Sequence, residues 1–591
     1  MVEQNATSTS VGAQAGGKTI FGHPRGLFVL FFTEMWERFS YYGMRGLLVL
    51  YLTQHFLFSD ETSSVMYGVY TALVYVMTII GGSLADKYLG QRKAVTYGAI
   101  LLVLGHATMA FEGAGAKEYL TYQGTDYIVT LDGRGGDAPQ IIVSDSGQSK
   151  ISFSEDGSTL LVGEPAKVGL PATIAVADYQ TRIEQQEMFV WILYLALGLI
   201  IAGVGFLKAN ISTIVGALYG IGDVRRDSGF SIFYMGINLG SLLSSVTIGI
   251  IGIKYGWNWG FGLAGIGMVA GLAVFVWGQK FLEGAAEPPD PAKLKEKVFG
   301  PLNVETMCYL AGVGIVVVAI GLIYTATVDL GSVNMTALRN GALASLGIIT
   351  FIGFILYSLM KLEGDERNQM LAATYFVVAQ IPFWALFEQA GSSLTLFTSR
   401  LVDREMFGWD VPTPVFQGLN AGYIVLFAPI LAWLWLALDK RRLNPSAPVK
   451  FAIGVFLAGL GFLSLVAGMN ASGASGLTAV GFIFLIYWIH TMGELLVSPV
   501  GLSSVTKLAP ARMVGLTMGA WFLYSGLSNY LAGVIAASTG AETLGGQLTD
   551  VAAAKATYAT VYTNVAYVAM GIAVVMLLIS PVIKRLMRGA E

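Results

Sequence analysis

The feature that most restricts the fold of this chain is a series of long apolar runs that recurs along its whole length. We identify fourteen of them, at 27–52, 63–85, 94–111, 189–215, 229–252, 259–282, 303–325, 340–360, 369–393, 415–438, 450–468, 478–505, 513–538 and 558–583. A helix of about 20 apolar residues crosses the hydrocarbon core of a bilayer. Only 12% of the 591 residues are charged, whereas soluble domains carry about 25%. The sequence therefore predicts an all-α membrane protein with fourteen spans.

Lysine and arginine are concentrated in alternate connections between these runs. Those on the rich side are Lys87, Arg92, Lys93, Arg225, Arg226, Lys293, Lys295, Lys297, Lys361, Arg367, Lys440, Arg441, Arg442, Lys507, Arg512, Lys584, Arg585 and Arg588. The short connections of the other side hold few, apart from Arg400 and Arg404, which are close in the sequence to Asp403 and Glu405. Because cytoplasmic loops carry the positive excess, the tails 1–26 and 586–591 are predicted to be cytoplasmic.

Residues 112–188 interrupt the series with a polar segment on the opposite, extracytoplasmic side. Short β-prone stretches at 127–131, 140–143, 150–153 and 159–162 are separated by turn-forming Asp-Gly and Ser-Gly pairs. We expect a small β-rich insert between the third and fourth spans. Since no intramembrane polar residue lies in it, we also expect transport to survive its removal within a few-fold.

The first apolar run contains an unusual set of charges. Glu34, Glu37, Arg38, Tyr41 and Arg45 fall within an arc of roughly 100° when the run is drawn as a helix. Each charge inside a membrane costs at least about 2.5–3.5 kcal/mol, so such residues usually mark a polar pathway within a helical bundle. The alternative is a helix whose charges pair with one another and only fix its packing.

Further polar residues recur in a limited set of the other runs. They are Lys208 and Asn210 in the fourth, Asn238 in the fifth, Trp384, Glu388 and Gln389 in the ninth, Asn420 in the tenth, Glu494 and Ser498 in the twelfth, and Trp521 in the thirteenth. Interhelical hydrogen bonds worth about 0.6 kcal/mol each would explain an asparagine or two. They do not explain a lysine and two further carboxylates, and charges of both signs suit a ligand that carries both signs.

Several function classes are excluded by the same residues. The net charge of −3 gives no nucleic-acid footprint, and the single cysteine, Cys308, rules out a cysteine metal cluster. The segment 12–19 matches a phosphate-loop pattern but lacks the strand and helix that such a loop needs. We therefore expect no enzyme activity and no bound cofactor or metal.

Four motifs together carry a family resemblance. The stretch 34–43, Glu-Met-Trp-Glu-Arg-Phe-Ser-Tyr-Tyr-Gly, resembles the Glu-x-x-Glu-Arg signature of the proton-coupled oligopeptide transporters, a family within the major facilitator superfamily. The stretches 233–240, 383–389 and 493–499 are similar to later signatures of that family. Residues 82–93, with Asp86 and Arg92, resemble the cytoplasmic loop signature of the superfamily, whose charges can latch two helices.

The resemblance implies a fold of two six-helix halves that alternate access to a central site. The halves would be 27–111 with 189–282, and 367–585, while 283–366 would hold a linker and the extra helical hairpin of prokaryotic members. It implies proton-driven import of di- and tripeptides through a bacterial inner membrane, with the proton as the coupling ion. We expect the protein to act as a monomer.

The resemblance also implies a role for each matching residue. Arg45 and Lys208 would attract the peptide carboxylate, and Asn238, Asn420 and Glu494 would meet its amine, with Ser498 one turn beyond Glu494. Side-chain pockets would be shaped by Tyr41, Tyr42, Tyr75, Trp384 and Trp521. Glu34, Glu37, Arg38, Lys208 and Glu388 would couple the proton, with Lys208 paired to Glu34 or Glu37. Arg45 would pair with Glu388 across the outer gate, and Asp86 and Arg92 of the loop signature would also take part in gating.

The sequence departs from the family pattern in two places, and it leaves two alternative functions open. Gly68 replaces a histidine of animal members, and the insert 112–188 has no counterpart. A family relative that carries nitrate or another anion would need the cations but has little use for Glu494. A transporter-derived sensor would use the insert as its ligand platform.

Overall fold

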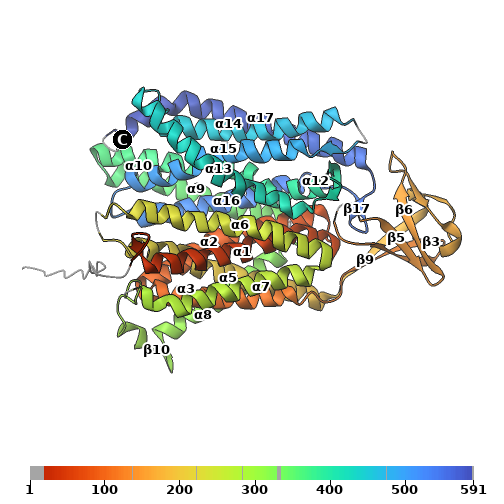
Figure 1. The fold of residues 1–591 in the computed structure, drawn as a ribbon, viewed down its shortest axis with the longest axis horizontal. Helices are drawn as coiled ribbons and strands as arrows, with labels where there is room; N and C mark the ends of the chain where they lie inside the picture. Colours follow the sequence, from red (N-terminus) through yellow and green to blue (C-terminus); the bar gives the residue numbers. More distant parts are fainter. Residues whose placement is uncertain are drawn as a thin grey trace, which may run out of the picture.

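The computed structural model describes residues 19–135, 138–220, 223–282, 284–328, 335–473 and 476–588. Residues 1–18 of the predicted N-terminal tail, with most of the phosphate-loop-like segment, lie outside this range, as do 589–591. The described chain is a bundle of long, roughly parallel and antiparallel helices, with a β-sheet projecting from one end (Figure 1). Helices dominate because a backbone in lipid must satisfy its own hydrogen bonds.

The N-terminal half of the bundle consists of six long helices. They are α1 (Arg25–Gln54), α2 (Asp60–Leu84), α3 (Gln91–Ala110), α5 (Glu187–Ala217), α6 (Arg226–Tyr255) and α7 (Trp257–Gly278). A π-helical turn, η1 (Ala85–Leu89), continues α2 into the connection to α3. Short strands β1 (Thr19–Ile20) and β2 (His23–Pro24) precede α1, and β10 (Lys297–Phe299) and β11 (Leu302–Asn303) follow the half.

Two further helices connect this half to the second one. α8 (Val304–Tyr324) packs on the N-terminal half, where Tyr97 Oη donates to the Tyr309 carbonyl at 2.8 Å. α9 (Met335–Lys361) packs on the C-terminal half, where Tyr524 Oη donates to the Gly347 carbonyl at 2.8 Å. The predicted hairpin therefore divides its two helices between the halves.

The C-terminal half contains the remaining helices. They are α10 (Gly364–Ala379), α11 (Ile381–Phe387), η5 (Glu388–Gly391), α12 (Ser393–Leu401), α13 (Thr413–Lys440), α14 (Ala447–Ala471), α15 (Gly481–Leu508), α16 (Val514–Ala537) and α17 (Val551–Leu586). The run 369–393, which we predicted as one continuous span, is interrupted near Pro382 and again at η5. Proline lacks a backbone N–H, so it interrupts the hydrogen-bond ladder of the helix. Glu388 is presented at the second interruption.

The insert forms a seven-stranded sheet in the order β8-β7-β6-β5-β4-β3-β9, with antiparallel neighbours. Its strands are β3 (Lys117–Tyr122), β4 (Thr125–Leu131), β5 (Gln140–Ser144), β6 (Gly147–Phe153), β7 (Thr159–Val162), β8 (Thr173–Ala175) and β9 (Tyr179–Glu184), with the short helix α4 (Pro165–Val168). The four β-prone stretches of the sequence are strands β4 to β7. The first and last strands, β3 and β9, pair with each other, so both ends of the insert leave from one place.

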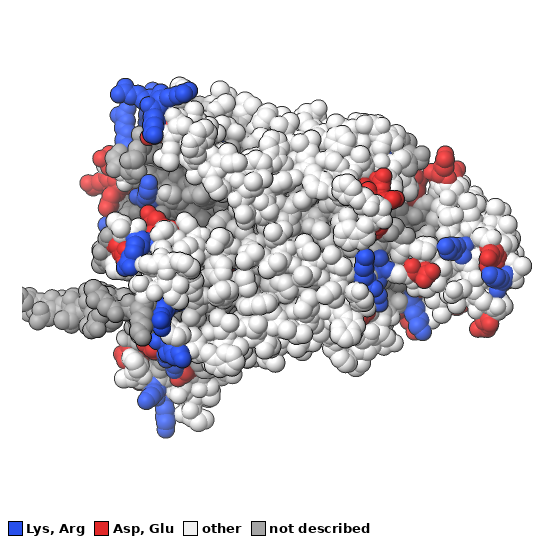
Figure 2. Space-filling view, viewed as in Figure 1, with Lys and Arg blue, Asp and Glu red and all other residues white. Residues whose placement is uncertain are grey.

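Charged side chains lie at the two ends of the molecule, and the broad band between them is almost free of charge on the face shown in Figure 2. Within the described ranges, twelve helices are long and apolar enough to cross a membrane. The protein is a multi-pass membrane protein. α1 and α16 are not among the twelve, although each has a predicted span, so the count of fourteen stays a prediction.

The two halves contact each other closely at the end that carries the sheet. α2 meets α16 through Gly68 and Gly533, where a Cβ added to Gly68 would come within 2.7 Å of the Gly533 Cα atom. α6 meets α13 through Gly249, whose added Cβ would lie 2.9 Å from Pro414. Any larger residue at these positions would push the backbones apart. The bundle is therefore closed on the sheet side.

Candidate functional site

A cleft lies between the halves, on the inner side of this closure. It encloses about 530 Å³, partly open to solvent, and is lined by Tyr42, Arg45, Ser241, Ser245, Phe387, Ala390, Gly391, Gln417, Asn420, Tyr487 and His490. Three of these, Tyr42, Arg45 and Asn420, are residues that the sequence singled out. The serines, Gln417 and Tyr487 were missed because single hydroxyl or amide groups in apolar runs are common and carry no pattern.

Arg45 joins the halves at the closed end of the cleft. Its guanidinium, on α1, forms a buried ion pair with Glu388 on η5 and donates to Tyr67 Oη on α2. The exposed fractions of the Arg45 and Glu388 side chains are only 10% and 5%. A buried charge without a partner is strongly unfavourable, so this pair resists separation of the halves while both groups stay charged.

The charged cluster on α1 is arranged differently from our expectation. Arg38 Nε contacts Glu34 Oε1 at 2.9 Å and Glu37 Oε2 at 2.6 Å, and all three side chains are almost fully buried. One Arg side chain thus holds both carboxylates, since a guanidinium has several donors. Glu34 Oε2 and Glu37 Oε1 are buried and have no hydrogen-bond partner among the residues that the structure describes, which leaves oxygens to take a proton.

Lys208 of α5 is only partly buried and lies over the ring of Tyr75 on α2, with Nζ 3.9 Å from the ring centroid. We predicted an ion pair between Lys208 and Glu34 or Glu37. In the described part of the chain no carboxylate lies within ion-pairing distance of Lys208, because Arg38 already occupies both acids. A cation over an aromatic face is stabilised by the ring quadrupole, which holds Lys208 close to the cluster without an ion pair.

The C-terminal half supplies an acidic group to the same region. Asn420 of α13 donates from Nδ2 to Glu494 Oε2 of α15 at 2.7 Å and to Thr491 Oγ1 at 3.1 Å. Both Asn420 and Glu494 are partly exposed, and Ser498 is partly exposed one turn further along α15. The adjacent His490 is buried and contacts the Ala458 carbonyl at 3.0 Å, in keeping with a structural role.

The other predicted residues vary in their access to the cleft. Asn238 is buried on α6 and donates to the Tyr234 carbonyl at 3.0 Å. Tyr41 is buried beside Tyr42, with ring centroids 5.4 Å apart. Trp384 is partly buried, and its indole Nε1 has no hydrogen-bond partner in the described ranges, whereas Trp521 is packed in the core of the C-terminal half.

The two expected gating residues of the loop signature 82–93, Asp86 and Arg92, each contact a different partner. Asp86 accepts a hydrogen bond from Gln91 at 2.8 Å, and Arg92 pairs with Glu287 at 2.7 Å. Gly90, with φ +70°, makes the turn, and the backbone of Glu287 and Pro288 lies directly against it. The connection after α7 therefore lies close enough to Gly90 for the Glu287 carboxylate to pair with Arg92.

A second buried ion pair between the halves was not expected from the sequence. Arg400 Nη1 of α12 lies 2.7 Å from Asp60 Oδ2 at the start of α2, and the exposed fraction of both side chains is 3%. In the sequence, Arg400 and Arg404 are close to Asp403 and Glu405. Arg404 contacts Asp410 at 3.3 Å, and Arg400 turns toward the other half. Asp60 gave no signal because it looks like an ordinary acidic first turn of a helix.

Residues 92–551 match the family model described as the POT family. That range covers more than half of the chain. This chain belongs to the POT family. The family resemblance read from residues 34–43 and the later motifs is thereby confirmed.

Relatives in the POT family match over nearly the full chain. The peptide transporter YePEPT of Yersinia enterocolitica is 32% identical over 541 residues, covering 90% of each chain. The uncharacterized transporter YclF of Bacillus subtilis is 34% identical over 97% of this chain and 96% of its own. A crystal structure of a peptide transporter POT in complex with sulfate is 31% identical and superposes with a TM-score of 0.72, covering 97% of this chain and 98% of that one.

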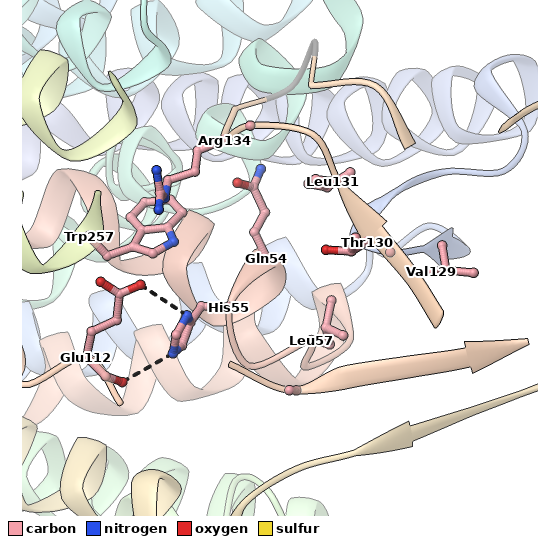
Figure 3. Close-up of a pocket in the computed structure, with 12 residues that line it drawn as sticks. Gln54, His55, Leu57, Glu112, Val129, Thr130, Leu131, Arg134 and Trp257 are labelled. Carbon is pink, nitrogen blue, oxygen red and sulfur yellow. Dashed lines mark hydrogen bonds and ion pairs between the residues drawn. The ribbon is translucent and has the colours of Figure 1, made fainter. Parts of the chain in front are cut away.

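This POT family member has a further pocket outside the cleft, between the bundle and the sheet (Figure 3). It encloses about 720 Å³, partly open to solvent, and its polar lining includes Gln54, His55, Glu112 and Arg134. His55 Nδ1 lies 3.5 Å from Glu112 Oε1 and its Nε2 lies 3.2 Å from the Glu112 carbonyl. Burial lowers the pKa of His55, and the Glu112 carboxylate opposes that change. These contacts fix the root of the insert.

Proposed function

We propose that this chain is a proton-coupled importer of di- and tripeptides in a bacterial cytoplasmic membrane, with both termini in the cytoplasm. Support comes from the relatives, which include a di-/tripeptide transporter of Lactococcus lactis that is 32% identical over 86% of this chain. The lysine and arginine excess on one side of the bundle supports the orientation. A single polypeptide contains the complete cleft, which supports a functional monomer.

The observation that carries the substrate class is the distribution of buried and partly buried charge between the two halves, at the cleft and beside it. The N-terminal half contributes Arg45 and Lys208, and the C-terminal half contributes Glu494, held by Asn420. A short peptide carries an amine at one end and a carboxylate at the other. In our proposal the carboxylate binds at the cations and the amine at Glu494, with Asn238 and Ser498 nearby. Tyr41, Tyr42, Tyr75 and Trp384 then contact side chains.

Proton coupling follows from the ion pairs. While Glu388 is charged it occupies Arg45, and protonation of Glu388 would release Arg45 for the peptide carboxylate. The unpartnered oxygens of Glu34 and Glu37 offer a second place for a proton beside Lys208. The proton breaks an ion pair, and the peptide carboxylate then takes the place of the protonated acid. Both ligands therefore bias the same equilibrium between the two access states, which links their movements.

Uptake by proteoliposomes tests this proposal. We expect an imposed inward proton gradient to drive accumulation of dialanine, and we expect little competition from nitrate or from N-acetyl-dialanine, which lacks the amine. Glu494→Gln should reduce the preference for the free amine, whereas Glu305→Gln, an equivalent change at the surface pair with Lys93, should not. Nitrate uptake without peptide uptake would overturn the proposal.

A further inference from the structure

The insert is anchored to the N-terminal half at both of its ends. Ala116 N–H donates to the His55 carbonyl at 2.8 Å, and Gln185 Nε2 donates to the Phe56 carbonyl at 2.5 Å. Both acceptors follow directly after α1, and the contacts of Glu112 with His55 reinforce the same root (Figure 3). β3 and β9 are paired along their length, so both ends of the sheet are held at the end of α1. We therefore treat the sheet and α1 as one rigid unit.

The other side of the sheet holds a segment of the C-terminal half. The connection between α16 and α17 forms a hairpin of β16 (Thr543–Leu544) and β17 (Gln547–Leu548), which we call the 543–548 hairpin. Leu544 of this hairpin is 2% exposed and belongs to the apolar core of the sheet, with Leu120, Val129 and Ile142. Figure 1 shows β17 between the bundle and the sheet. The core of the insert is thus completed by a residue from the opposite half.

Hydrogen bonds surround the buried leucine. Gly545 N–H donates to Glu118 Oε2 at 2.5 Å, and Gln140 Nε2 donates to the Leu544 carbonyl at 2.5 Å. From the hairpin, Gln547 Nε2 donates to the Gly135 carbonyl at 2.9 Å. Glu118, Gln140 and Gln547 are all buried. Buried polar groups in native proteins are almost always hydrogen-bonded, and these are. The hydrogen bonds therefore indicate a specific contact between the hairpin and the sheet.

The 543–548 hairpin also contacts the closed end of the bundle. Arg400 Nη2 donates to the Gly546 carbonyl at 3.2 Å, and Arg400 forms the buried pair with Asp60. Ala541 N–H, just before the hairpin, lies 3.4 Å from Asp60 Oδ2. Sheet, hairpin and ion pair therefore form one continuous assembly across the boundary between the halves.

We propose that the β-sheet insert is a latch that holds the sheet side of the transporter closed by gripping the 543–548 hairpin of the opposite half. This inference rests on the proposed alternating access, in which the two halves must separate on this side once per cycle. A body fixed to one half that buries a residue of the other must let go before they separate. The contact therefore shifts the population toward the state closed on the sheet side.

Labelling of a buried cysteine measures that population. Ser64 lies on α2 at the contact with α16 and is fully buried, so a thiol there reacts with a polar maleimide only when the sheet side opens. We use Ser64→Cys in a Cys308→Ser background, in detergent and without peptide. Burial of the Leu544 side chain stabilises the state that is closed on the sheet side. Leu544→Ser removes this stabilisation and should raise the labelling rate roughly 10-fold. Leu161→Ser, the same change on the exposed side of β7, should leave it unchanged.

A second variant keeps the test decisive if Leu544→Ser does not fold. Lys117 and Glu184 face each other across β3 and β9, so a short Gly/Ser loop can replace residues 118–183 without stretching the chain. This replacement should raise the labelling rate at least as much as Leu544→Ser. An unchanged rate in the loop replacement, whatever Leu544→Ser does, would overturn the latch. Dialanine uptake by the unmodified protein is measured separately. If this uptake is absent, the proposed substrate is wrong, but the labelling result still tests the latch.

Discussion

Replacing Asp60 by asparagine should open the sheet side of the transporter. The change leaves the Arg400 guanidinium buried without a counter-ion in the closed state, whereas both groups become hydrated when the halves separate. Removing one partner of a buried pair costs about 3–5 kcal/mol. Arg400 keeps its bond to the Gly546 carbonyl, and Asp60 Oδ1 and Arg400 Nε already lack hydrogen-bond partners within the described part of the chain, so we expect the lower end of this range. About 3 kcal/mol corresponds to a shift of roughly 100-fold toward the open state.

The shift can be measured as a distance between the halves. Tyr255, at the end of α6, and Phe407, in the connection between α12 and α13, are 69% and 103% exposed and lie at the sheet end on opposite halves. Spin labels at Tyr255→Cys and Phe407→Cys, in a Cys308→Ser background, report the separation by pulsed electron paramagnetic resonance. Asp60→Asn should move a large share of the distance distribution to longer values.

Two controls isolate the buried charge as the cause. Glu61→Gln neutralises the neighbouring acid, which is exposed in the same turn, and should leave the distribution unchanged. Asp60→Leu combined with Arg400→Met removes both charges and should restore the closed distribution, because an apolar pair of similar volume replaces a buried ion pair at little cost. A distribution in Asp60→Asn that matches the parent would refute the reasoning.

Three further predictions concern coupling, gating and pH. Lys208→Ala should abolish proton-driven accumulation of peptide while exchange of peptide without a gradient persists, as measured in proteoliposomes; full accumulation by the variant would contradict the coupling role. Reversing both Arg45 and Glu388, as Arg45→Glu with Glu388→Arg, should recover part of the uptake lost in each single reversal, and a double variant no better than the singles would argue against direct pairing. Burial raises the pKa of Glu118 above its ordinary value, and the hydrogen bond from Gly545 N–H only partly opposes this change; Tyr179 is a nearby titratable group. The latched state therefore binds a proton more readily than the released one, so lowering the pH through that raised pKa should slow Ser64→Cys labelling, after division by the rate for denatured protein at each pH. Glu118→Gln should remove this pH dependence.

The role of the insert shows where local reading of the sequence stops. Four of its strands could be predicted from their β-prone residues and turns, but nothing in 112–188 indicates a partner. The partner, Leu544, is an ordinary leucine in a polar connection more than 350 residues later. Our expectation that transport survives removal of the insert within a few-fold stays a prediction. The latch is compatible with it, because a latch shifts populations and lines no pathway.

The sequence by itself determined the class of protein, the approximate positions of most of the long helices and the charged residues buried in the bundle. These features are local: a charge in an apolar run is costly wherever the run packs, so Glu34, Lys208 and Glu494 stand out without a structure. Only the tertiary structure decided which partner each charge takes. Arg38 holds both acids of its own helix, Lys208 rests on Tyr75, and Arg400 crosses to Asp60. The partner of each charge depends on how helices that are distant in sequence pack against one another. That packing geometry cannot be predicted from any single apolar run.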